Sequence, residues 1–191
     1  MTEMEILEDM EKELLVDKYV LDYEGVFDYD GLIRLIDRWC EDNGFYRDID
    51  SHKEKVTAEG RNISIGYTLQ RKFDKRHFTV ICMDLSIEGM KDVEVELDGK
   101  KRRMLNRGTV EVTFHGYLMT SEKSRWETKG YAYFIRGVID KFIYKIDRPE
   151  YRGIASSDAF KLINEIRGFL NIHSNIGEGG PVKGRMKGGW K

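Results

Sequence analysis

The sequence predicts an α+β fold, in which helices pack on one face of an antiparallel sheet of about five to six strands. Two observations lead to this prediction. Residues 45–119 read as β-structure throughout, because apolar residues recur at alternate positions. Residues 127–146 then place apolar pairs four residues apart, and such pairs share one face only on an α-helix; the pairs are Phe134/Ile135, Val138/Ile139 and Phe142/Ile143.

The 191 residues suit a single domain with a core of its own. We divide the chain into an acidic arm over 1–17, one α+β domain over 18–173, and a glycine-rich basic tail over 174–191. Apolar spacing in the arm predicts a short helix over 3–16. Residues 1–30 contain eleven acids against two lysines, whereas the stretch from Ser174 has four basic residues against one acid, so we expect the two ends to attract each other, within one chain or between neighbouring copies.

The first elements of the domain follow from alternation and from capping residues. Alternating apolar residues predict a strand over 18–27, and a helical period then runs over 30–42. Asp28 or Asp30 can cap the start of this helix, because a carboxylate accepts the first free backbone N–H groups. Gly44 stands where a left-handed C-cap is expected.

The β block divides into several strands. Residues 63–69 alternate apolar and polar side chains, which predicts one wet face, while 78–85 are apolar on both faces and predict a central strand. A strand over 93–97 runs into the Asp98-Gly99 dipeptide, the strongest hairpin signal of the chain, and a further strand begins at Val110.

Two helices are predicted to close the domain. Arg148-Pro149 ends the helix over 127–146, since the residue before proline disfavours helical geometry. Ser156 or Ser157, with Asp158 in the first turn, begins the last helix over 157–171.

The redox state and the compartment follow from what the sequence contains. Cys40 and Cys82 are predicted to be free, buried thiols, because nothing near Met1 resembles a secretory signal. No apolar run approaches the ~20 residues that span a bilayer. We therefore expect a cytoplasmic protein without a transmembrane segment.

Motifs for catalysis are weak. The cysteines and histidines lack metal-site spacing, so we expect no metal and no cofactor; the histidines are His52, His77, His115 and His173. Glu111 and His115 share one side of a predicted strand and could pair as carboxylate and base, but a water-exposed sheet face explains them better. The glycines of 177–180 lack the flanking strand and helix of a phosphate loop. These observations favour a protein that is not an enzyme.

Two basic clusters are candidate contacts for a nucleic acid or another anion: Arg71, Lys72, Lys75 and Arg76 in one strand connection, and Lys100, Lys101, Arg102 and Arg103 in the next hairpin. If both connections lie at one edge of the sheet, they form a positive rim that could grip phosphates. Charged hairpin tips also keep sheet edges soluble, and that interpretation is favoured over nucleic-acid binding.

The features together favour a non-enzymatic binding or assembly module that acts through its terminal arms and sheet surface. A protein partner or self-association is expected, with Lys183, Arg185, Lys187 and Trp190 as candidate contacts. The first alternative is a carrier of an apolar ligand or lipid in a pocket between sheet and helices. The second is nucleic-acid binding through the basic hairpin tips.

Trp126, the run FIRGVIDKFIYK over 134–145 and EIRGFLN over 165–171 carry a resemblance. Over residues 20–172 the chain resembles a group of small uncharacterised archaeal proteins, which implies an archaeal setting, cytoplasmic or membrane-peripheral, and transfers no catalytic residues. It also resembles the helix-grip fold of START-like carriers, which implies a cavity for an apolar ligand. The chain departs from that pattern because two helices, and not one, are predicted to close it.

Overall fold

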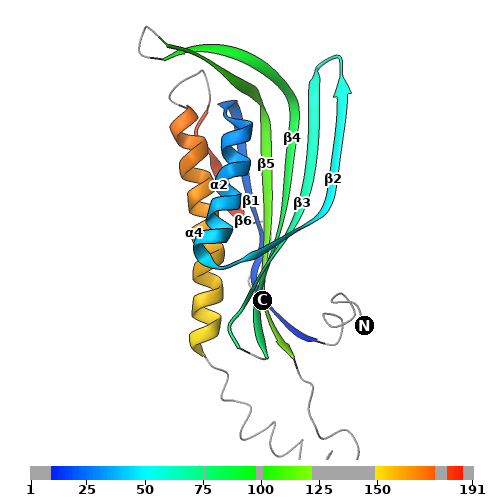
Figure 1. The fold of residues 1–191 in the computed structure, drawn as a ribbon, viewed down its shortest axis with the longest axis vertical. Helices are drawn as coiled ribbons and strands as arrows, with labels where there is room; N and C mark the ends of the chain where they lie inside the picture. Colours follow the sequence, from blue (N-terminus) through cyan, green and yellow to red (C-terminus); the bar gives the residue numbers. More distant parts are fainter. Residues whose placement is uncertain (1–9, 75, 98–100, 122–148, 175–179, 187–191) are drawn as a thin grey trace, which may run out of the picture.

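A computed structural model describes residues 10–74, 76–97, 101–121, 149–174 and 180–186. These residues form a six-stranded antiparallel sheet with two helices against one of its faces (Figure 1). The predicted α+β class is therefore confirmed. The helix predicted over 127–146, which includes Gly137, lies outside the described residues, as does the Asp98-Gly99 dipeptide.

The sheet has the strand order β2-β3-β4-β5-β1-β6. Strands β2 to β5 form a meander in chain order, β1 pairs with the far side of β5, and β6 pairs with β1. The two edge strands are therefore β2 and β6. The bounds are β1 (Met10–Phe27), β2 (Tyr46–Thr57), β3 (Gly60–Lys72), β4 (His77–Leu97), β5 (Lys101–Ser121) and β6 (Lys183–Met186).

The helix α2 (Tyr29–Asn43) has both of the caps that its sequence predicts. Asp28 is the N-cap, and its carboxylate accepts the Gly31 N–H at 2.8 Å. Gly44 ends the helix in the left-handed region with a φ of 68°, where a side chain would be strained.

The second helix, α4 (Pro149–Ser174), begins earlier than expected. The predicted start at Ser156 or Ser157 is wrong, because the helix already runs through both residues. Pro149 forms the first turn, where proline is tolerated since the first N–H groups of a helix have no partner within it. Pro149, which predicts the end of the helix over 127–146, is thus the first residue of α4.

The N-terminal arm also differs from the expectation. The predicted helix over 3–16 is wrong from Met10 onward, because the backbone from Met10 to Leu14 pairs with β5. A short acidic helix has little stability of its own, whereas strand pairing satisfies its backbone along a neighbour. Val16 is consequently buried in the core, with 1% of its surface exposed.

One face of the sheet and the helices enclose the core. The helix-facing side chains of the central strands have at most 4% of their surface exposed; they are Ile63, Ile65, Tyr67 and Leu69 on β3 and Ile81, Met83, Leu85 and Ile87 on β4. From α4 the core receives Leu162, Ile163, Ile166 and Leu170, each with 0% exposed. The alternating residues of β3 are polar and face away, which confirms the predicted wet face. The central position predicted for 78–85 is confirmed by β4.

The end of the sheet that carries the β4–β5 hairpin bends over the helices (Figure 1). Backbones come very close at this bend: a Cβ on Gly108 would lie 2.8 Å from the Glu88 carbonyl oxygen. The register between β4 and β5 also shifts between Glu88 and Lys91. The bend carries the β4–β5 hairpin toward the start of α2, where Arg103 pairs with Asp28 at 2.6 Å.

The basic tail returns to its own chain. β6 pairs with β1, and Arg185 forms an ion pair with Asp22 at 3.2 Å. The predicted attraction between the oppositely charged ends therefore occurs within one chain. The two cysteines are free, as predicted: Cys40 is buried on α2, and Cys82 is half-buried on the face of β4 that points away from the helices.

Candidate interaction surface

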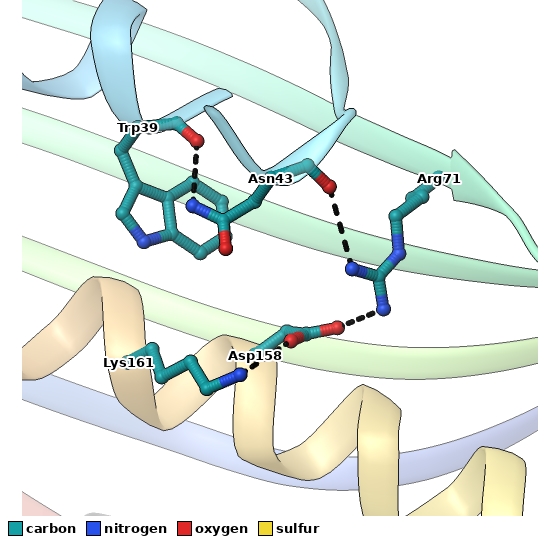
Figure 2. A network of polar contacts seen from close by, with 5 residues as sticks. All are labelled: Trp39, Asn43, Arg71, Asp158 and Lys161. Carbon is teal, nitrogen blue, oxygen red and sulfur yellow. Dashed lines mark hydrogen bonds and ion pairs between the residues drawn. The ribbon is translucent and has the colours of Figure 1, made fainter. Parts of the chain in front are cut away.

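Arg71 lies at the junction of β3 with both helices (Figure 2). Its guanidinium forms an ion pair with Asp158 of α4, and the Nη1 group donates to the Asn43 carbonyl oxygen at 3.3 Å. The guanidinium carbon also lies 4.9 Å from the ring centroids of both Phe45 and Phe73. Arg71 is therefore engaged within the fold and has little surface left for an external anion.

Asp158 holds this junction together. Only 2% of its side chain is exposed, so its charge must be satisfied inside the protein. Lys161, one helical turn later, adds a weaker contact with a separation of 3.4 Å between its Nζ and Asp158 Oδ1. A buried carboxylate with two cationic partners fixes α4 against the end of β3.

The turn between β3 and β4 is built around Asp74. Its Oδ1 accepts the Arg76 N–H at 2.7 Å and the His77 N–H at 3.0 Å, and His77 Nδ1 lies 3.0 Å away. The Tyr151 hydroxyl of α4 donates to Oδ2 at 3.2 Å. The pKa of the Asp74 carboxyl is lowered from its ordinary value of 3.8, chiefly by the Arg76 N–H and further by His77, while burial acts in the opposite direction.

Asp74→Asn is expected to lower the free energy of unfolding by about 1 kcal/mol at neutral pH, because charge-assisted hydrogen bonds to the turn are lost. The lowered pKa means that the stabilisation is present above the unfolded-state value of 3.8 and is lost as the pH falls toward the folded-state value. Urea unfolding across this acid range should show that the difference in free energy of unfolding between variant and wild type becomes smaller as the pH falls. A difference that stays constant would contradict the role of the charge, and Asp84→Asn, at an exposed position of β4, is the control.

The two basic clusters lie far apart. The first cluster precedes β4 and the second follows it, so the two occupy opposite ends of a 21-residue strand. The expectation of one positive rim is therefore wrong, because antiparallel pairing sends consecutive turns to opposite ends of the sheet.

The members of the clusters also have different surroundings. Lys72 and Arg76 are exposed, and the Lys72 ammonium lies 5.5 Å from the Phe78 ring centroid. Arg103 is engaged by Asp28, as described above. Lys75 and Lys100 lie outside the described residues, and for Lys101 and Arg102 only the backbone, paired in β5, is described.

Of the predicted tail contacts, Lys183 and Arg185 belong to β6 and so pair with β1 of the same chain. Lys187 and Trp190 lie outside the described residues. The described part of the tail therefore pairs with the β1 edge over Tyr19–Asp22.

The sheet face that points away from the helices carries Glu111 and His115. In the described part of the chain no hydrogen bond joins these two side chains; His115 instead lies beside Tyr117, with ring centroids 6.5 Å apart. Cys82 is the cross-strand neighbour of His115. Burial raises the pKa of the Cys82 thiol, which opposes formation of the reactive thiolate. This row of side chains does not form an activated nucleophile.

β2 is the exposed edge of the sheet (Figure 1). Ten of its twelve residues are exposed and the other two are half-buried. Its outward surface includes large apolar side chains, with 74% of Val56, 68% of Tyr46 and 46% of Ile49 exposed. Within the described sheet β2 has a neighbour only on its β3 side, so a row of backbone N–H and C=O groups faces outward.

Two open hollows mark the surface of the described residues. One, of about 490 Å³, is lined only by α2 and α4, and includes Trp39 and Phe169 beside Arg38 and Glu165. The other, of about 710 Å³, lies where β1, β4 and β5 meet Gly180 and carries both acidic and basic side chains. Neither lies between the sheet and the helices, where the apolar-carrier alternative predicts a pocket, and that alternative stays a prediction.

Over the ranges that the structure describes, no group of three or more His, Cys, Asp or Glu side chains is arranged to hold a metal ion. No described helix has the combination of length and hydropathy that crossing a membrane requires. Comparison with protein-family models, curated proteins and solved structures finds no match to this chain.

Sequence reasoning did not single out the residues of the exposed edge. Residues 46–57 were placed within the β block, but the strand order that leaves them at an edge depends on pairings between distant segments. A signal was nevertheless present, because this segment contains acidic residues in its first half and lysines in its second half. Asp158 was likewise interpreted only as a residue of a first helical turn.

Proposed function

We propose that the protein is a non-enzymatic binding and assembly module, and that the open edge of β2 is its contact surface. The observation that carries the proposal is a difference between the two edges of the described sheet: the β1 edge is paired with β6 over Tyr19–Asp22, whereas no described strand pairs with the outer edge of the twelve-residue β2. An exposed strand edge can bind an extended segment by adding it to the sheet, with main-chain hydrogen bonds giving affinity.

The exposed apolar side chains on β2 support the same proposal. Val56 and Ile49 would lose contact with water when another strand is added beside them. The described part of the tail pairs with β1 at the opposite edge. Partner contacts through the rest of the terminal arms stay a prediction.

Site-specific photocrosslinking tests this proposal. A benzophenone amino acid at position 56 on β2 is expected to give a discrete adduct when the purified protein is added to extract of its own cells and irradiated. The same probe at position 172, where Ile172 of α4 is 64% exposed, is the matched control. Adducts at position 172 but none at position 56 would reject β2 as the contact surface.

A further inference from the structure

We propose that the strand added to β2 is β2 of a second copy of this chain, paired antiparallel about a twofold axis at His52. This inference rests on the proposed function and names its partner. Three features of β2 support this pairing: the order of its charges, the face to which each side chain points, and one irregularity in the strand.

Pairing with β3 shows which β2 side chains share a face. Asp48 pairs with Thr68, Lys53 with Ser64 and Lys55 with Asn62. Those three β3 residues alternate with the buried Ile63, Ile65 and Tyr67, so they point away from the helices. Asp50 belongs to the same face, since its Oδ2 accepts the Thr68 hydroxyl at 2.6 Å. One face of β2 therefore carries the two acids, then Ser51, then the two lysines.

This order of charges is complementary to the same order on a strand that runs in the opposite direction. When two β2 strands run antiparallel about His52, Lys55 of each copy lies opposite Asp48 of the other. Lys53 of each copy then lies opposite Ser51 and the adjacent extra residue Asp50. A twofold axis makes every such pair occur twice, so each lysine and each acid of this face has a partner of opposite charge.

The irregularity in β2 makes this register consistent with the alternation of side chains. The pairing of β2 with β3 shifts by one residue between Ile49 and Ser51. If the same extra residue is accommodated against the second copy, Asp48 and Lys55 point to the same face. Without it, residues at these positions would point to opposite faces.

The helix-facing side of β2 is also compatible with pairing to a second copy. His52 pairs with Ile65 of β3 and so points to that side, where it would lie opposite His52 of the second copy. Ile49 would lie diagonal to Val56 of the second copy, within reach for aliphatic contact. Two exposed apolar residues of each chain would then be covered.

Charges on an edge strand usually prevent such pairing. When all charges on an edge strand have the same sign, they repel a second copy at every register. β2 carries both signs in an order that makes one antiparallel register attractive, and in the described part of the chain no ion pair engages Lys53 or Lys55.

Charge reversal tests the register. The wild type is expected to sediment as a dimer, whereas Lys53→Glu/Lys55→Glu and Asp48→Lys/Asp50→Lys should each raise the dissociation constant at least about tenfold, because all four cross-strand pairs become repulsive. An equimolar mixture of the two variants should form a heterodimer, since every pair is then attractive. Lys91→Glu/Lys183→Glu makes the same change in net charge as Lys53→Glu/Lys55→Glu, away from β2, and should remain dimeric.

A cysteine on the axis supplies a second measurement. His52→Cys should form an intermolecular disulfide on oxidation, because a residue on a twofold axis meets its own copy at cross-strand distance. Val56→Cys, four residues from the axis and also exposed, should not. Wild type, which retains Cys40 and Cys82, gives the background.

Different results would contradict the two proposals, that β2 is a contact surface and that a second copy is its partner. A wild type that stays monomeric at its highest soluble concentration, or charge variants that all remain dimeric, would overturn the second copy as the partner. If position 56 still crosslinks to a different protein, the β2 contact surface stands without self-pairing. If position 56 gives no adduct, the contact surface itself is rejected.

Discussion

Asp158→Ala is expected to lower the free energy of unfolding by about 3 kcal/mol. The substitution leaves the Arg71 guanidinium between two aromatic rings without its carboxylate partner. An unpaired charge in a largely buried position costs much more than the loss of one surface contact. Urea unfolding followed by circular dichroism measures the difference.

Lys161→Ala provides the matched control for Asp158→Ala. Lys161 contacts the same carboxylate, but 58% of its side chain is exposed, so its removal should cost less than about 1 kcal/mol. The double variant Arg71→Met/Asp158→Leu should recover part of the loss, because apolar side chains then replace both charges. Equal losses for Asp158→Ala and Lys161→Ala would contradict the central place of the Arg71–Asp158 pair.

Phe114→Ala is expected to cost about 3–5 kcal/mol, because it removes an aromatic side chain from the middle of the core. Phe114 lies on β5 with 0% of its surface exposed and faces the helices. Thr113, the preceding residue, points to the other face and is half-buried. Thr113→Ala should therefore cost less than about 1 kcal/mol.

This comparison tests whether the helices cover only one face of the sheet. Thermal or urea unfolding of both variants gives the two free energies under the same conditions. Similar losses at positions 113 and 114 would mean that both faces of β5 are packed to the same extent, and the layered arrangement would be wrong.

Local signals in the sequence predicted the fold class well. The caps of α2 could be predicted because Asp28 and Gly44 act through backbone geometry within a few residues. Alternation in β3 could be predicted because one face packs against helices and the other does not. Both signals depend on short stretches of chain, which is the information that a sequence presents directly.

Features that depend on distant partners were missed. Residues from Met10 onward form a strand because β5 lies beside them, and their own apolar spacing does not show that neighbour. Arg71 resembled a member of a basic cluster because Lys72 follows it, whereas its partner Asp158 lies 87 residues later. The position of β2 at an edge likewise follows from the strand order, which depends on pairings between distant segments.

Amide hydrogen exchange of β2, measured by mass spectrometry, tests directly whether β2 pairs with a second copy. Peptides covering 46–57 should exchange more slowly in the wild type than in Lys53→Glu/Lys55→Glu at the same concentration. Their protection in the wild type should also increase with concentration, since pairing with a second copy occupies the outward N–H groups. Peptides of α4 should show no such dependence. Exchange of β2 that is fast, independent of concentration and equal in the two proteins would contradict the account.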